Sequence, residues 1–287
     1  MTVMPAASRF DIAAVDVRAP DAPTAFTRSL HDTGFAVLRH HPIDPDLIAR
    51  LYHGWGALFA SPDIDDYLFD PVTQDGYFPF RSENARDSAV KDLKAFFHVY
   101  PGTRLPPALA VDTMALYQDL LTLGALLLGW LQDHLPPAIR DRLTETMPAM
   151  LAGSMQSLFR VLHYPALPAD IEPGAVRAAA HEDINLITLL VAGTAPGLEA
   201  RDRAGRWHAV PCDPGMIVVN GGDMLAVATG GYLPATPHRV VNPTAGQDVA
   251  RQSMPMFLHP RPEVVLAPGL TAGAFLDRRL REIGLKP

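Results

Sequence analysis

The chain has 287 residues, of which 48% are hydrophobic and 19% charged, and its net charge is −7 at pH 7. This size suits one large globular domain, and the acidic balance leaves no basic stripe, so no nucleic-acid or membrane partner is expected. A small-molecule substrate is the better expectation. Cys212 is the single cysteine, which excludes an internal disulfide; with no secretory signal visible, this favours a cytoplasmic protein.

Residues 1–150 are predicted to be largely helical, with two strands near the start. Apolar, β-branched residues over 9–17 and 34–42 indicate those strands. Helices are expected over 22–31, 45–60, 106–135 and 137–147. The most apolar run, 120–131, is shorter than the about 20 residues of a membrane span, so we predict a buried helix there.

Between the second and third helices, residues 71–100 are predicted to be irregular and rich in aromatic and polar side chains. This segment is a candidate wall of a substrate pocket. Two of its aromatic residues, Phe96 and Phe97, are instead expected to be core residues of a helix.

From Met155 onward the pattern changes to short β-rich segments separated by Gly, Pro, Asn and Asp. Strands at this spacing indicate a sandwich or a double-sheet jelly roll. We therefore predict a mainly β fold with flanking helices, in which the strand near residue 35 joins the same sheet. The chain is expected to be a single domain. Its parts are a helical region (1–150), a β-rich catalytic core (151–262) and a C-terminal helix (263–287).

The run HEDINLITLL begins with a histidine and an aspartate two residues apart. In a strand the side chains alternate, so His181 and Asp183 share one face. A further histidine, His238, lies 55 residues after Asp183 and begins another β-branched run in TPHRVVNP. Two imidazoles and one carboxylate form the three-ligand face that holds non-haem Fe(II) and leaves positions open for oxygen and substrate.

A later strand, in ARQSMPMFLHP, adds Arg251 and Ser253 on one face. A guanidinium binds both oxygens of a carboxylate, and a serine hydroxyl adds one hydrogen bond. The pair therefore predicts a carboxylated cosubstrate beside the metal.

Together, HEDINLITLL, VNGGDMLAVATGGYLPATPHRVV and RQSMPMFLHP resemble the core of the isopenicillin N synthase-like 2-oxoglutarate and Fe(II)-dependent oxygenases. The resemblance implies a double-stranded β-helix core, with iron held by His181, Asp183 and His238. It also implies that Arg251 and Ser253 bind the 5-carboxylate of 2-oxoglutarate, and that the phenol of Tyr164 can donate to this cosubstrate. The family's plant members carry an asparagine where this chain has Leu162.

A member of this family uses Fe(II), 2-oxoglutarate and O2 to hydroxylate, desaturate or cyclise a small molecule, with succinate and CO2 as co-products. The substrate is expected to be an amino acid or another intermediate of secondary metabolism. Its contacts are expected from Tyr77, Phe78, Arg81, Glu83 and Asn84 of the irregular segment, and from Arg160, which alternates with Leu162 and Tyr164 on one strand face.

Three alternatives remain at this stage. An oxidase of isopenicillin N synthase type would use no 2-oxoglutarate, and its Arg251 and Ser253 would hold the substrate's own carboxylate. A cupin-like protein would bind a metal and a ligand without redox chemistry. A sensing module with a degenerate site is disfavoured because all three metal ligands are present.

Overall fold

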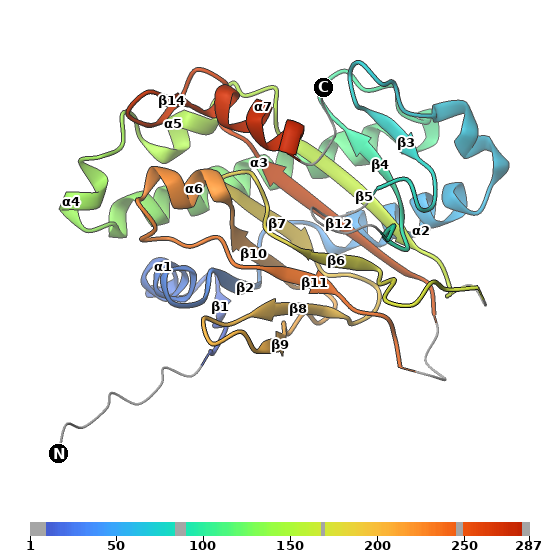
Figure 1. Ribbon diagram of the computed structural model, residues 1–287, viewed down its shortest axis with the longest axis horizontal. Helices are drawn as coiled ribbons and strands as arrows, with labels where there is room; N and C mark the ends of the chain where they lie inside the picture. Colours follow the sequence, from blue (N-terminus) through green and yellow to red (C-terminus); the bar gives the residue numbers. More distant parts are fainter. Residues whose placement is uncertain (1–9, 84–89, 168–169, 245–248, 283–287) are drawn as a thin grey trace.

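The computed structural model describes residues 10–83, 90–167, 170–244 and 249–282. Within them, two sheets face each other, and helices cover the outer side of the larger sheet (Figure 1). The larger sheet consists, in spatial order, of β1 (Ala14–Asp16), β2 (Phe35–Arg39), β10 (Ile217–Gly221), β7 (Ile187–Val191), β12 (Arg251–Leu258), β5 (Leu158–Tyr164), β4 (Ala95–Val99) and β3 (Gly76–Phe78). The smaller sheet consists of β6 (Ala178–His181), β11 (His238–Val240), β8 (Leu198–Arg201) and β9 (Trp207–Ala209).

This double-sheet core is the double-stranded β-helix that the sequence predicted. The pairings in both sheets are antiparallel, except that β1 runs parallel to β2. The strand near residue 35 joins the larger sheet as expected, because β2 pairs with β10. A small hairpin of β13 (Val265–Ala267) and β14 (Leu270–Thr271) precedes the last helix.

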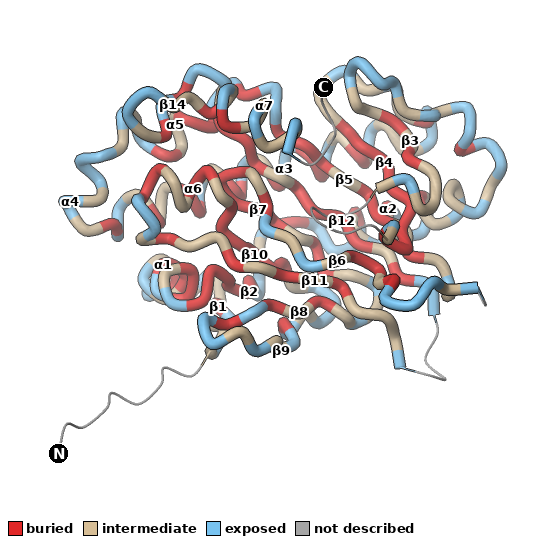
Figure 2. The backbone as a smooth tube through the Cα atoms, viewed as in Figure 1, coloured by how far each residue is buried: buried red, intermediate tan, exposed pale blue. Residues whose placement is uncertain are grey.

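Two clusters of buried apolar side chains fill the fold. Figure 2 shows in red where the buried residues lie along the backbone. One cluster lies between the sheets and includes Phe35, Phe96, Leu162 and Val240. The other lies between the larger sheet and its helices. These helices are α1 (Ala22–Thr33), α2 (Pro45–Phe59), α3 (Pro107–His134), α4 (Pro137–Arg140) and α5 (Met147–Leu151), and η1 (Pro62–Tyr67) is a 3-10 helix. Two helices follow later in the chain, α6 (Asp223–Ala228) and α7 (Ala272–Glu282).

Helix α3 is the central helix of the second cluster. As a whole it is long and apolar enough, by length and composition, to cross a membrane, although the run 120–131 alone is not. In the fold its buried side, with Tyr117, Leu120 and Leu127, packs in the cluster formed with the sheet. The prediction of a buried core helix agrees with this packing.

Three predicted elements were wrong. The C-terminal helix expected over 263–287 begins only at Ala272, because β13 and β14 form a hairpin before it. Residues 71–100, expected to be irregular, contain β3 and β4, which extend the larger sheet. Phe96 and Phe97 are therefore core residues of a strand rather than of a helix, and alternation sends them into different clusters. The helix expected over 137–147 ends at Arg140, and α5 begins separately at Met147, where Thr146 accepts a hydrogen bond from the backbone N–H of Ala149.

The close packing of α3 against β12 gives a stability prediction. A Cβ at Gly124 would lie 2.0 Å from Cδ1 of the fully buried Leu258, whereas a Cβ at Gly129 meets only Pro148 at 3.9 Å. Overpacking costs about 1–3 kcal/mol, which exceeds the roughly 0.5–1 kcal/mol that alanine gains over glycine in a helix. Gly124→Ala should thus lower the free energy of unfolding, measured by urea denaturation, and Gly129→Ala should leave it equal or higher. Equal effects of the two variants would contradict this packing.

Candidate metal centre and cavity

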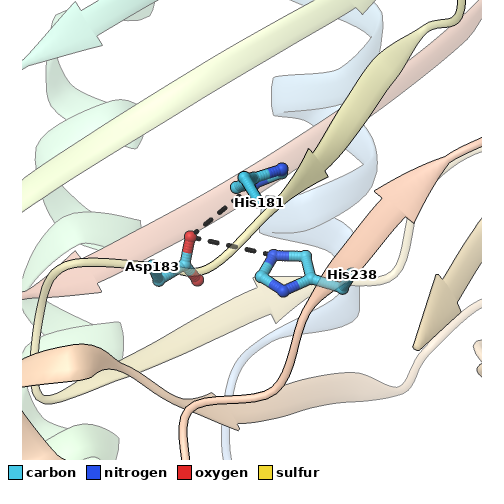
Figure 3. A group of neighbouring side chains, drawn as sticks. All are labelled: His181, Asp183 and His238. Carbon is cyan, nitrogen blue, oxygen red and sulfur yellow. Dashed lines mark ion pairs between the residues drawn. The ribbon is translucent and has the colours of Figure 1, made fainter. Parts of the chain in front are cut away.

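The two sheet strands β6 and β11 bring the predicted metal ligands together. His181, the last residue of β6, is the register partner of His238, the first residue of β11. Asp183 follows β6 by two residues. Figure 3 shows both imidazole rings directed at the Asp183 carboxylate, and the ligand atoms of the three side chains all lie within 4.8 Å of one another. Nε2 of His181 and Nε2 of His238 lie 3.8 Å and 3.7 Å from Asp183 Oδ1.

Hydrogen bonds orient each of these side chains. Nδ1 of His181 lies 2.8 Å from the carbonyl oxygen of Ala179, and Nδ1 of His238 lies 3.0 Å from that of Thr236. Each Nδ1–H therefore donates to the backbone, which assigns the free lone pair to Nε2. This lone pair faces the carboxylate, where a metal ion would be bound.

The Asp183 carboxylate is held on its other side. Its Oδ2 accepts hydrogen bonds from Thr188 Oγ1 at 2.6 Å and from Asn220 Nδ2 at 2.8 Å, so Oδ1 is left to face the two imidazoles. Burial alone would raise the pKa of Asp183, but the neighbouring imidazoles and these hydrogen bonds lower it. The carboxylate is thus ionised, as a metal ligand must be.

The His181 imidazole is also in the required protonation state. Desolvation, together with the neighbouring His238, lowers the pKa of His181 to about 4. A neutral imidazole with an oriented Nε2 is the form that binds a divalent metal. Two nitrogens and one carboxylate oxygen on one face are the donor set of a non-haem Fe(II) site, so these residues fit the metal.

A cavity of about 1550 Å³ opens beside this centre, and His181 and Asp183 line it. On one side it is bounded by α7, through Phe275, Leu276 and Arg279. The opposite wall comes from β4 and β5 and the residues that precede β4. We call this wall the charged wall; it consists of Glu83, Asp92, Lys94, His98 and Arg160.

The charged wall is a connected network in which Asp92, Lys94 and His98 are buried and Glu83 and Arg160 are half-buried. Arg160 donates from Nη1 and Nη2 to the two carboxylate oxygens of Glu83, at 3.2 and 3.4 Å, and from Nε to His98 Nε2 at 2.8 Å. Burial and the Arg160 charge hold the pKa of His98 well below its usual value, so its Nε2 is an acceptor. Arg160 and Glu83, both predicted as substrate contacts, therefore do line the cavity.

The other predicted substrate contacts are placed elsewhere. Tyr77, Phe78 and Arg81 do not line the cavity. Because side chains alternate along β3, the Tyr77 ring turns toward Phe59 of α2, while the Phe78 ring stacks on Phe69 and Phe96 between the sheets. Arg81 lies over the Phe80 ring and 4.0 Å from Asp170. Asn84 lies outside the described residues.

Several cavity residues were not predicted. Lys94 and His98 alternate with Phe96 on one face of β4, a pattern visible in KAFFH once this stretch is recognised as a strand. His259 also lines the cavity, and burial lowers its pKa to about 4. His163, which neighbours Leu162 and Tyr164 on β5, does not line the cavity and stacks on Phe59 at a centroid distance of 5.1 Å.

The predicted carboxylate-binding residues meet deep between the sheets. Arg251 and Ser253 pair in register with Tyr164 and Leu162, and the Arg251 guanidinium lies 5.0 Å from the Tyr164 ring centre. Arg251 Nη1 donates to Ser253 Oγ at 3.1 Å. Alternation along β12 places Arg251 and Ser253 on the same face as Phe257, which lines the cavity.

The environment of Arg251 fits an anionic ligand. Its side chain is 2% exposed, and among the described residues no carboxylate lies within 4.0 Å of its guanidinium nitrogens. A buried charge without a counter-charge is costly, so a bound carboxylate would stabilise this site. The arrangement provides a metal centre and an anion site on one inner surface.

Known oxygenases are similar to this chain in sequence and in structure. Residues 156–260 match the model of the 2OG-Fe(II) oxygenase superfamily. A solved oxygenase from Shewanella oneidensis is 43% identical with a TM-score of 0.87, over 96% of this chain and 100% of that chain. A 2OG-Fe(II) oxygenase family protein from Caulobacter crescentus is 31% identical with a TM-score of 0.79, over 95% of this chain and 99% of that one. The proline hydroxylase buaE of Petromyces alliaceus is 29% identical and covers 86% of this chain and 85% of its own.

The fold, the metal centre and these similarities define a non-haem iron oxygenase. This chain belongs to the 2OG-Fe(II) oxygenase family, and the resemblance to its isopenicillin N synthase-like members is confirmed. It is therefore a dioxygenase that uses Fe(II), 2-oxoglutarate and O2.

Proposed function

We propose that this enzyme oxidises a small polar substrate at a C–H bond, with Fe(II) held by His181, Asp183 and His238. The observation that carries the proposal is the convergence of two oriented Nε2 atoms and one carboxylate oxygen beside the cavity. Bound iron with 2-oxoglutarate and O2 supplies the oxidant, and succinate and CO2 are the co-products. The surrounding residues position the reacting carbon and exclude water from the site.

Arg251 and Ser253 are proposed to bind the 5-carboxylate of 2-oxoglutarate, with Tyr164 beside them. The buried guanidinium supplies charge, and Ser253 supplies a hydroxyl whose position Arg251 already fixes. Family membership supports the use of 2-oxoglutarate over the oxidase alternative and over a metal-binding protein without redox chemistry.

For the substrate we propose a small zwitterion such as an amino acid. Arg160 and Glu83 present a guanidinium and a carboxylate side by side on the charged wall. A substrate carboxylate can face the first group and an ammonium the second, since both pairings are charge-assisted. The similarity to a proline hydroxylase over most of both chains supports this substrate class.

Loss of the Arg251 charge should weaken the binding of 2-oxoglutarate. A charge-assisted hydrogen bond contributes about 1.5–3 kcal/mol, so Arg251→Ala should raise the KM for 2-oxoglutarate by roughly 10- to 100-fold. Arg50→Ala, which removes an exposed pair with Asp112, is the matched control and should leave that KM unchanged. If Arg251→Ala raised only the KM of the organic substrate, the oxidase alternative would hold.

The substrate class can be tested by measuring which compounds accelerate succinate formation. Free amino acids should stimulate it, whereas their N-acetylated or esterified counterparts should not, because these lack one of the two charges. Arg160→Gln should abolish the difference between an amino acid and its ester while leaving the KM for 2-oxoglutarate unchanged. If only uncharged or purely apolar compounds stimulated succinate formation, the zwitterion proposal would be refuted, and the assignment of the iron site would still hold.

A further inference from the structure

The two histidines of the metal centre are held unequally by the sheet. In the smaller sheet the strand order is β6-β11-β8-β9, so β11 is paired on both sides and β6 is an edge strand. His238 therefore lies in an interior strand and His181 in a strand with one open edge. The side chain of His181 is 37% exposed, against 10% for that of His238.

The outer edge of β6 is held by the residues that precede β4. The backbone N–H of Leu93 donates to the carbonyl of Val176 at 2.9 Å, and the Oδ1 atom of Asp92 accepts from the backbone N–H of Ala179 at 3.0 Å. Asp92 is 3% exposed. Its carboxylate thus makes the hydrogen bond that a neighbouring strand would otherwise make.

Ala179 links this contact to the metal centre. Its N–H is bound by Asp92, and its carbonyl accepts from Nδ1 of His181 at 2.8 Å. That second bond fixes the ring rotation and the tautomer that direct Nε2 toward Asp183. Anything that shifts the backbone at Ala179 must therefore shift the imidazole.

Asp92 is itself held in place by the charged wall. Its Oδ2 accepts from Lys94 Nζ at 2.9 Å, and Lys94 Nζ also lies 2.7 Å from Glu83, which binds Arg160. Lys94 is 7% exposed, so this ion pair is shielded from solvent. A continuous set of contacts thus runs from the cavity wall to the strand that carries His181.

We propose that Asp92 is a positioning residue for the iron ligand His181. It acts through the backbone of Ala179 and is not itself one of the three metal ligands. This inference rests on the proposed function, in that it takes His181 to be a ligand of Fe(II). Asp92 is therefore required for tight metal binding. In the described part of the chain β6 pairs with β11 alone, so no second strand holds the backbone of Ala179 if the Asp92 contact is lost.

Fe(II) affinity, measured by anaerobic calorimetric titration on the full chain, tests the proposal without reference to turnover. Asp92→Ala should weaken Fe(II) binding by roughly 10- to 100-fold, as loss of an outer-shell partner typically does. Asp92→Asn keeps an acceptor oxygen for the Ala179 N–H and should recover most of the affinity. Ala179→Pro removes the same hydrogen bond from the donor side, and proline is tolerated on an edge strand; it should reproduce the loss.

Asp202→Ala is the matched control. Asp202, which follows β8 of the same sheet, is also buried and accepts backbone N–H groups, from Ala204 at 2.9 Å and Arg206 at 2.8 Å, but it does not contact Ala179 or His181. Its loss should leave the Fe(II) affinity unchanged.

The inference would be overturned if folded Asp92→Ala bound Fe(II) with wild-type affinity. If Asp92→Ala does not fold, wild-type affinity in Ala179→Pro would overturn it instead. An equal loss in Asp202→Ala would overturn it too, since the effect would then be general destabilisation. Failure of the wild-type chain to bind Fe(II) would instead overturn the proposed function.

Discussion

The structure depends on one constraint: two imidazoles and one carboxylate must converge on one point, where the side chains of Asp183 and His238 are largely removed from water. The antiparallel pairing of β6 with β11 places His181 opposite His238, and Asp183 completes the set from the loop that follows. Bringing these groups together is unfavourable unless each is oriented by hydrogen bonds. Backbone carbonyls orient both rings, and Thr188 and Asn220 orient the carboxylate.

The interior between the two sheets is organised around this centre. At one end lie the metal ligands and the cavity with its charged wall; deeper inside lies the Arg251 guanidinium beside Tyr164. Apolar side chains such as Leu162 and Phe96 lie between the sheets. Such a surface suits a cosubstrate that has a carboxylate at each end and a short carbon chain between them. The helices on the other face of the larger sheet supply the buried area that keeps this interior rigid.

Local alternation was sufficient to predict the chemistry. The period of two along a strand related Arg251 to Ser253, and both share one face of β12 in the structure. It also related His181 to Asp183; the two side chains do meet, but β6 ends at His181 and Asp183 reaches the site from the loop that follows. The third ligand, His238, was predicted because it begins a β-branched run, which indicates a strand. These features could be found because each depends on residues that are close in sequence.

The cavity walls depend on contacts between distant segments, which the sequence does not show. Arg160 was predicted as a substrate contact and Lys94 was not; both line the cavity because Glu83 pairs with each of them, a contact that brings β5 and the residues before β4 together. Tyr77 and Phe78 looked like pocket residues because their segment was taken as irregular, and a short strand turns both rings into packing contacts. The position of α7 along the cavity likewise follows from tertiary packing rather than from its own amphipathic pattern.

The most direct test of the central claim is an anaerobic absorption titration of the chain with Fe(II) in the presence of 2-oxoglutarate. The 2-oxo acid chelated to iron should give a visible charge-transfer band that saturates at one Fe(II) per chain, and His238→Ala should not form it. Absence of the band in the wild-type chain, or an undiminished band in His238→Ala, would contradict the assignment of this site.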